Sequence, residues 1–266
     1  IALFKNTEDK YFTIEEYETL VKANQTDKNG RLIYLYATNK TDQFAYIQDA
    51  KNKGYDVLLL DGQLDQHYIN HLESKLEKTG FVRVDSEIAD KLIVKDDTND
   101  SKLSWDEQME LGAIFQDHLP KENHFSVVFE NRTETDQPMT ITQSEFMRRM
   151  RDMGSLSGMS FYNNLPASFN LVVNLNHPIV KNLMAEKDQK LGNDLVNIQS
   201  EIKATEMELN SLNDNLKNKK EEEISQSEKD QKENLNKSVS ELKDRKKELY
   251  KSFGSENKIA KQLIDL

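Results

Sequence analysis

The feature that most constrains the fold lies in the last third of the chain, where apolar residues recur at alternating steps of four and three residues. Polar and charged side chains fill most of the positions between them. Such a spacing keeps one apolar seam along a helix and is the pattern of a coiled coil. This seam comprises Leu191, Leu195, Ile198, Ile202, Thr205, Leu209, Leu212 and Leu216.

Two arrangements of this segment fit the sequence, a helical hairpin and one continuous helix. The stretch KKEEEISQSEKDQ contains Ser225 and Glu228 at the spacing of a capping box, which favours a new helix and hence an antiparallel coiled-coil hairpin over residues 186–258. The absence of glycine and proline from residues 193–253 keeps the continuous helix open as an alternative. A second seam with the same alternating spacing follows this capping box and comprises Leu235, Val239, Leu242, Lys246, Leu249 and Phe253.

The first hundred residues alternate between helical and strand patterns. Apolar stretches predict strands at residues 31–37, 55–60 and 81–84, and the segments between them have helical spacing. Strands joined by helices of this length form parallel sheets with helices on both faces. We therefore predict a small three-layer αβα unit over residues 1–100.

The second part of the chain predicts an α+β domain. Strand patterns occupy residues 124–131, 138–143 and 169–175, and Asn176-His177-Pro178 has the composition of a helix start. The chain is therefore expected to be α+β overall, with the coiled-coil hairpin inserted into a domain at residues 101–266.

Both ends suggest a piece of a longer protein. The chain begins at Ile1 without a methionine, and it ends in an apolar helical pattern that has no stop signal. We therefore expect a fragment whose last domain is truncated.

Composition argues against several classes of protein. The 266-residue chain has a net charge of −11, which is unsuited to binding nucleic acid phosphates. No apolar run approaches the roughly 18 residues of a membrane-spanning helix. Because the chain has no cysteine, it has neither disulfides nor thiol nucleophiles. These features predict a soluble, cytoplasmic protein that binds neither nucleic acid nor a membrane.

The sequence contains no motif that predicts an enzyme. Glycine patterns that bind phosphate and the G-x-S-x-G nucleophile motif are both absent. His67 and His71 have the spacing of two metal ligands on one helix, but a metal site needs a third and usually a fourth ligand. We predict no catalytic residue, cofactor or metal in this chain.

Methionine is concentrated in one short stretch, since five of the eight methionines lie between residues 139 and 159. In the short helix predicted to end at Gly154, an apolar stripe of Phe146, Met150 and Met153 lies beside three arginines. Core packing is one interpretation of this stripe. A protein-contact surface is the other, because methionine adapts to varied partners and a Gly/Ser-rich segment follows.

Several stretches resemble the 90-kilodalton heat-shock chaperones, most closely their bacterial HtpG-type branch. The tyrosine-rich strand at residues 33–36, Lys53-Gly54, the leucine-rich strand at 57–60 and Leu64-Asp65 are similar to the end of the family's middle domain. FENRTETDQPMTIT and LVVNLNHPIVKNL are similar to two stretches of its C-terminal domain, in the same order.

The resemblance covers residues 11–185 and resumes at 259–266. It implies an ATP-driven, homodimeric chaperone of the stress response that binds unfolded or partly folded client proteins. The family's ATP-binding domain, with its ATP and Mg²⁺, would precede Ile1, so this fragment is not expected to hydrolyse ATP although its parent would. The family dimerises through C-terminal helices, which implies a homodimeric parent.

The resemblance also implies a client-binding surface. The family's methionine-rich client-contacting helix matches Phe146, Met150 and Met153, and a client-contacting asparagine matches Asn70. A client-contacting tryptophan of the family matches His67, which is a departure. With their neighbours, the predicted client-binding residues are Phe146, Met147, Met150, Met153, Met159, Phe161 and Asn70.

Three hypotheses of different classes follow. The leading one is the client-binding and dimerisation fragment of a molecular chaperone. The second is a structural coiled-coil protein that forms a fixed homo-oligomer without chaperone activity. The third is a metal-dependent enzyme that uses His67 and His71.

Overall fold

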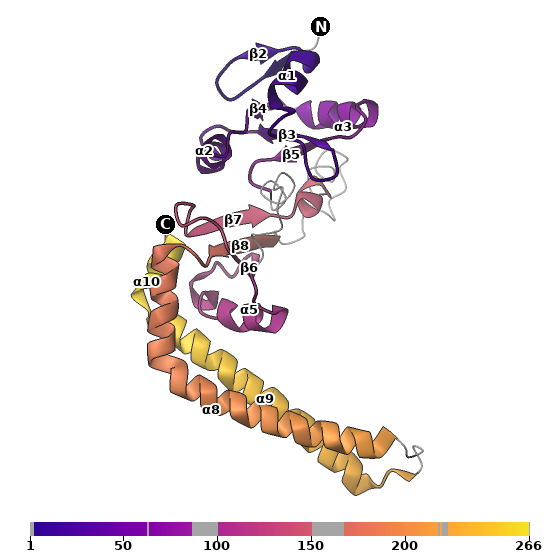
Figure 1. Cartoon of the computed structure of the whole chain (residues 1–266), viewed down its shortest axis with the longest axis vertical. Helices are drawn as coiled ribbons and strands as arrows, with labels where there is room; N and C mark the ends of the chain where they lie inside the picture. The colour runs from indigo at the N-terminus through magenta and orange to yellow at the C-terminus, as the bar shows by residue number, and fades with distance from the viewer. Residues whose placement is uncertain are drawn as a thin grey trace.

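The chain folds into two units with separate sheets and a long helical arm (Figure 1). The computed structural model describes residues 3–62, 64–86, 101–150, 168–217, 219 and 223–265. The first unit is residues 3–86, the second unit is residues 101–265, and the arm is formed by α8 (Pro178–Lys217) and α9 (Gln226–Glu256). This mixed architecture confirms the predicted α+β class. The predicted boundary near residue 100 lies beside undescribed residues and stays a prediction.

The sheet of the first unit is parallel, as predicted. Its strands are β3 (Leu32–Ala37), β4 (Val57–Leu59) and β5 (Thr79–Arg83), in the order β4-β3-β5. Leu35 in the central strand lies opposite both Val57 and Val82. Every residue of β3 is buried, as expected for a strand covered on both faces.

Helices cover both faces of this sheet and confirm the three layers. α1 (Ile14–Val21) and α3 (Asp65–Lys75) pack on the face that carries Tyr34 and Tyr36. α2 (Phe44–Asn52) packs on the opposite face. A short antiparallel ribbon of β1 (Phe4–Lys5) and β2 (Tyr11–Phe12) was not predicted from the sequence.

The sheet of the second unit has the three predicted strands in an order that does not follow the sequence. β8 (Ser168–Asn174) lies between β6 (His124–Glu130) and β7 (Met139–Gln143). It runs parallel to β6 and antiparallel to β7. One apolar core joins this sheet to α5 (Trp105–Gly112), both arm helices and α10 (Lys258–Asp265), and the short helix η1 (Gln116–His118) follows α5.

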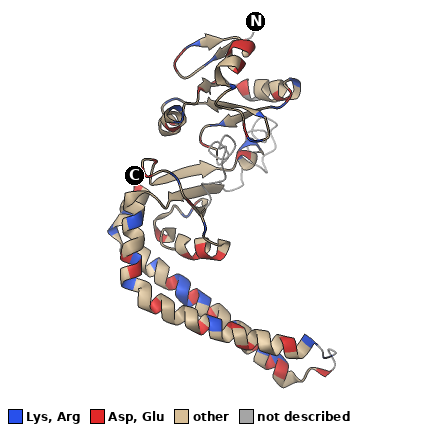
Figure 2. Ribbon diagram, viewed as in Figure 1, with Lys and Arg blue, Asp and Glu red and all other residues tan. Residues whose placement is uncertain are grey.

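The arm is a helical hairpin, so the alternative of one continuous helix is wrong. Its second helix begins at the predicted capping box of Ser225 and Glu228. All residues of the two predicted seams are buried or half-buried. Charges of both signs are distributed along the arm (Figure 2). Among the described residues, no helix combines the length and apolar character needed to cross a bilayer.

A buried lysine fixes the base of the arm. Lys246 occupies a seam position of α9, where its Nζ lies 2.7 Å from Glu110 Oε2 on α5 and 2.7 Å from Gln199 Oε1 on α8. A polar residue at a single seam position permits only the register that satisfies it. Lys246 therefore aligns the two arm helices with each other and with α5.

Candidate functional site

The predicted apolar stripe begins on a helix that lies between the two units. Residues 145–150 are helical, and the Met147 amide donates to the Ser144 hydroxyl at 3.4 Å, so Ser144 caps the start of this helix. Phe146 is 69% exposed, whereas Met147 and Met150 are half-buried. The structure thus places part of the stripe at the surface and not in the core.

The remaining predicted residues fall into two groups. Asn70 is exposed on α3 of the first unit. Three more, which are Met153, Met159 and Phe161, lie outside the described residues.

The opposite side of this helix is anchored to the first unit by a buried arginine. The Arg148 guanidinium donates to Glu145 Oε1 at 2.6 Å and to the Tyr36 hydroxyl at 2.9 Å. All three side chains are buried, and the guanidinium carbon lies 5.9 Å from the centre of the Tyr36 ring. A buried charge needs such partners because its desolvation is costly.

A second arginine joins the same helix to α3 and to the edge of the first sheet. Arg149 makes a two-pronged contact with Glu73, at 2.8 and 3.1 Å, and its Nε lies 2.7 Å from Glu145. Arg149 also donates to the Phe81 carbonyl, while Glu73 accepts from the Phe81 amide at 2.8 Å. The ion pair therefore covers backbone groups of the edge strand β5 that would otherwise be open to pairing.

The charges in this contact reinforce each other. Burial alone would raise the pKa of Glu73, but the hydrogen bonds from Arg149 and the Phe81 amide outweigh it and lower that pKa below its ordinary value of 4.5. Burial likewise opposes the charge of Arg149, yet Glu73 and Glu145 raise its pKa above the ordinary range. Both groups are therefore charged at neutral pH.

The lowered pKa of Glu73 predicts a pH dependence of stability. Because the folded state holds this carboxylate at a lower pKa than the unfolded state, its contribution is complete above pH 4.5 and is lost as the pH falls through the folded pKa. In urea unfolding, the stability difference between the wild type and Glu73→Gln should be constant from pH 7 to 5 and shrink below pH 4.5. An unchanged difference at pH 3.5 would contradict this assignment.

Further contacts join the units where β7 ends. The Gln143 backbone amide donates to the Asp85 carbonyl at 3.1 Å, and Arg83 donates to the Gln143 side-chain oxygen at 3.5 Å. The Tyr46 hydroxyl of α2 donates to the Ile141 carbonyl of β7. The helix that carries Phe146 therefore follows a strand that is itself fixed to the first unit.

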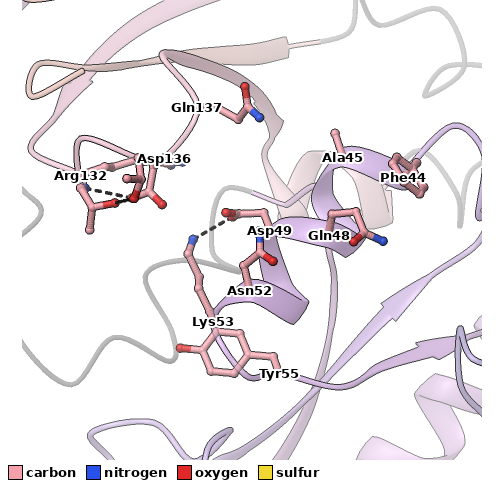
Figure 3. Close-up of a pocket in the computed structure, with 12 residues that line it drawn as sticks. Phe44, Ala45, Gln48, Asp49, Asn52, Lys53, Tyr55, Arg132, Asp136 and Gln137 are labelled. Carbon is pink, nitrogen blue, oxygen red and sulfur yellow. Dashed lines mark hydrogen bonds and ion pairs between the residues drawn. The ribbon is translucent and has the colours of Figure 1, made fainter. Parts of the chain in front are cut away.

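A polar cleft of about 720 Å³ separates α2 from the turn at residues 132–137 (Figure 3). Lys53 pairs with Asp49 at 2.8 Å on one wall, and Asp136 accepts from the Thr133 amide at 2.9 Å on the other. Because these charged groups bond within their own walls, we interpret the cleft as the space between the units and not as a ligand site.

The metal hypothesis gains no support from the structure. His67 and His71 are both exposed on α3. Within the described ranges, no three His, Cys, Asp or Glu side chains are grouped so that they could hold a metal ion.

Comparison with known families defines the class of protein. The family described as Hsp90 protein matches residues 3–205, a range that includes both three-stranded sheets and ends inside α8. The chain therefore belongs to the Hsp90 family of chaperones.

The relatives narrow the family to its bacterial HtpG-type members. The chain is 45% identical to the chaperone protein HtpG of Bacteroides thetaiotaomicron and 46% identical to that of Bacteroides fragilis strain 638R, over its whole length in both cases. It is 41% identical to the HtpG protein of Porphyromonas gingivalis over 99% of the chain. The match spans 39% of the length of each relative. The two Bacteroides matches extend over the residues of the arm.

Proposed function

We propose that this chain is the client-binding and dimerisation region of an ATP-dependent chaperone that acts in the cytoplasm. The observation that carries the client-binding role is Phe146, an exposed aromatic side chain on a helix whose arginine side is buried between the units. Its neighbours Met147 and Met150 are half-buried, which leaves part of each accessible. The partner is an unfolded or partly folded protein that presents apolar side chains.

The chemistry of this surface suits partners of varied sequence. An aromatic ring offers a large apolar area, and methionine side chains repack without a fixed shape. Asn70 on α3 would add a polar contact, and the proposal also includes Met153, Met159 and Phe161. A small apolar surface of this kind binds weakly, which allows a client to be released.

Replacing Phe146 tests the proposal directly. Phe146→Ser is expected to weaken binding of a permanently unfolded, fluorescently labelled protein about tenfold, which corresponds to about 1.4 kcal/mol of lost apolar contact. Its unfolding midpoint in urea should stay close to that of the wild type, because the side chain is 69% exposed. Fluorescence anisotropy measures the affinity.

Tyr11→Ser is the matched control, since Tyr11 is also aromatic and is 62% exposed on β2 of the first unit. It is expected to bind clients as the wild type does. Equal affinity of both variants and the wild type would contradict the proposed client-binding surface.

The proposal that the parent protein dimerises and hydrolyses ATP rests on its membership of the family. The heptad seams that motivated the structural homo-oligomer pack against each other within one chain. That alternative therefore has no free heptad seam in the described part of the arm, and we do not favour it.

A further inference from the structure

An ion pair lies between the two helices that carry the proposed client-binding residues. On α3, Glu73 follows Asn70 by three residues, and on the helix at 145–150, Arg149 follows Phe146 by three residues. Residues three apart lie on neighbouring positions of a helix surface. The contact between Glu73 and Arg149 therefore bridges the two halves of the proposed surface.

The geometry of this pair restricts how the two helices lie relative to each other. Both terminal guanidinium nitrogens, Nη1 and Nη2, contact Glu73, and the side chains of Glu73 and Arg149 are only 19% and 25% exposed. Each partner also bonds the backbone of Phe81, so both are fixed to β5. A two-pronged contact between planar groups restricts orientation as well as distance.

We propose that the Glu73–Arg149 ion pair is a positioning element that sets the spacing between Asn70 and Phe146, and that client affinity depends on it. This inference rests on the proposed client-binding function. A client segment that contacts both helices binds more tightly when their spacing is already fixed, because binding does not then have to order the two units. Neither member of the pair needs to contact the client.

The test is a double-mutant cycle in this chain with two measurements. Glu73→Gln, Arg149→Gln and the double variant are compared for their affinity for a labelled unfolded protein. The distance between the units is measured by electron spin resonance, with nitroxide labels on cysteines introduced at Lys75 and Lys121, which are exposed in the first and second unit. The absence of native cysteine makes this labelling specific.

Each single variant is expected to bind the client about fivefold more weakly and to broaden the distance distribution. The double variant should bind the client no more weakly than either single variant, because losing one partner already removes the ion pair. Glu18→Gln is the control, since it removes an exposed ion pair with Lys22 on α1, at 3.3 Å. It should change neither measurement.

A broadened distance distribution with unchanged client affinity would overturn the positioning role. It would not bear on the proposed function, which the Phe146→Ser variant tests separately. The positioning role would also be overturned if the affinity losses of the two single variants multiplied in the double variant. If a glutamine variant does not fold, Arg149→Lys takes its place, because lysine keeps the charge but cannot make the two-pronged contact. Wild-type affinity in Arg149→Lys would then count against the proposal.

Discussion

Gly254→Ala is expected to separate the end of α9 from Ile114 and the rest of the second unit, and to cost about 3 kcal/mol or more of stability, as severe overpacking does. A Cβ atom at this position would lie 1.9 Å from the carbonyl oxygen of Ile114 and 2.5 Å from its carbonyl carbon. Both are backbone atoms, so no side-chain rotation relieves the clash. Phe253, Tyr250 and Ile114 belong to the same buried core, so displacing α9 would expose apolar surface.

Gly192→Ala provides the matched control within the arm. Gly192 lies in α8, and a Cβ atom there would meet nothing within 4 Å. Because alanine is the better helix former, this change should stabilise the chain by about 0.5–1 kcal/mol. Urea unfolding of both variants measures the difference, and similar stabilities would show that α9 does not pack on Ile114 as described.

Arg148→Ala is expected to cost about 3 kcal/mol, because it leaves Glu145 with one cation fewer and the Tyr36 hydroxyl without its arginine donor. The side chains of Arg148 and Glu145 are 4% and 8% exposed, so water cannot easily replace the lost partner. The loss should appear as a lower urea midpoint and as faster amide exchange in residues 145–150.

Arg245→Ala is the control for this change. Arg245 is exposed on α9, and substitutions at such positions usually shift stability by less than about 0.5 kcal/mol. If Arg148→Ala were as stable as Arg245→Ala, the buried contact with Tyr36 could not be what anchors the helix.

Periodicity predicted the arm and the first unit because these elements depend on local spacing. The seam from Leu191 to Leu216 and the capping box at Ser225 describe one helix surface and one helix start. The parallel sheet followed from the alternation of strands and helices. The strand order of the second sheet did not follow, because β8 pairs with β6 at a distance of 44 residues, as in His124 and Ser168.

The site was predicted only in part for the same reason. The apolar stripe is a local pattern, and the structure leaves Phe146 exposed while it buries Arg148. The burial of Arg148 depends on Tyr36, which is 112 residues away, and Arg149 depends on Glu73, which is 76 residues away. The one local signal was Glu145, which lies four residues before Arg149 and pairs with it. No pattern in the sequence linked the arginines to the first unit.

The most direct test of the client-binding surface is site-specific photo-crosslinking to an unfolded protein. A benzophenone amino acid is placed at Phe146 or at Trp105, an equally exposed aromatic residue on α5, since the two are 69% and 71% exposed. The proposed surface predicts crosslinks from position 146 that an excess of unlabelled client abolishes, and few from position 105. Equal crosslinking from both positions, or none from position 146, would contradict it.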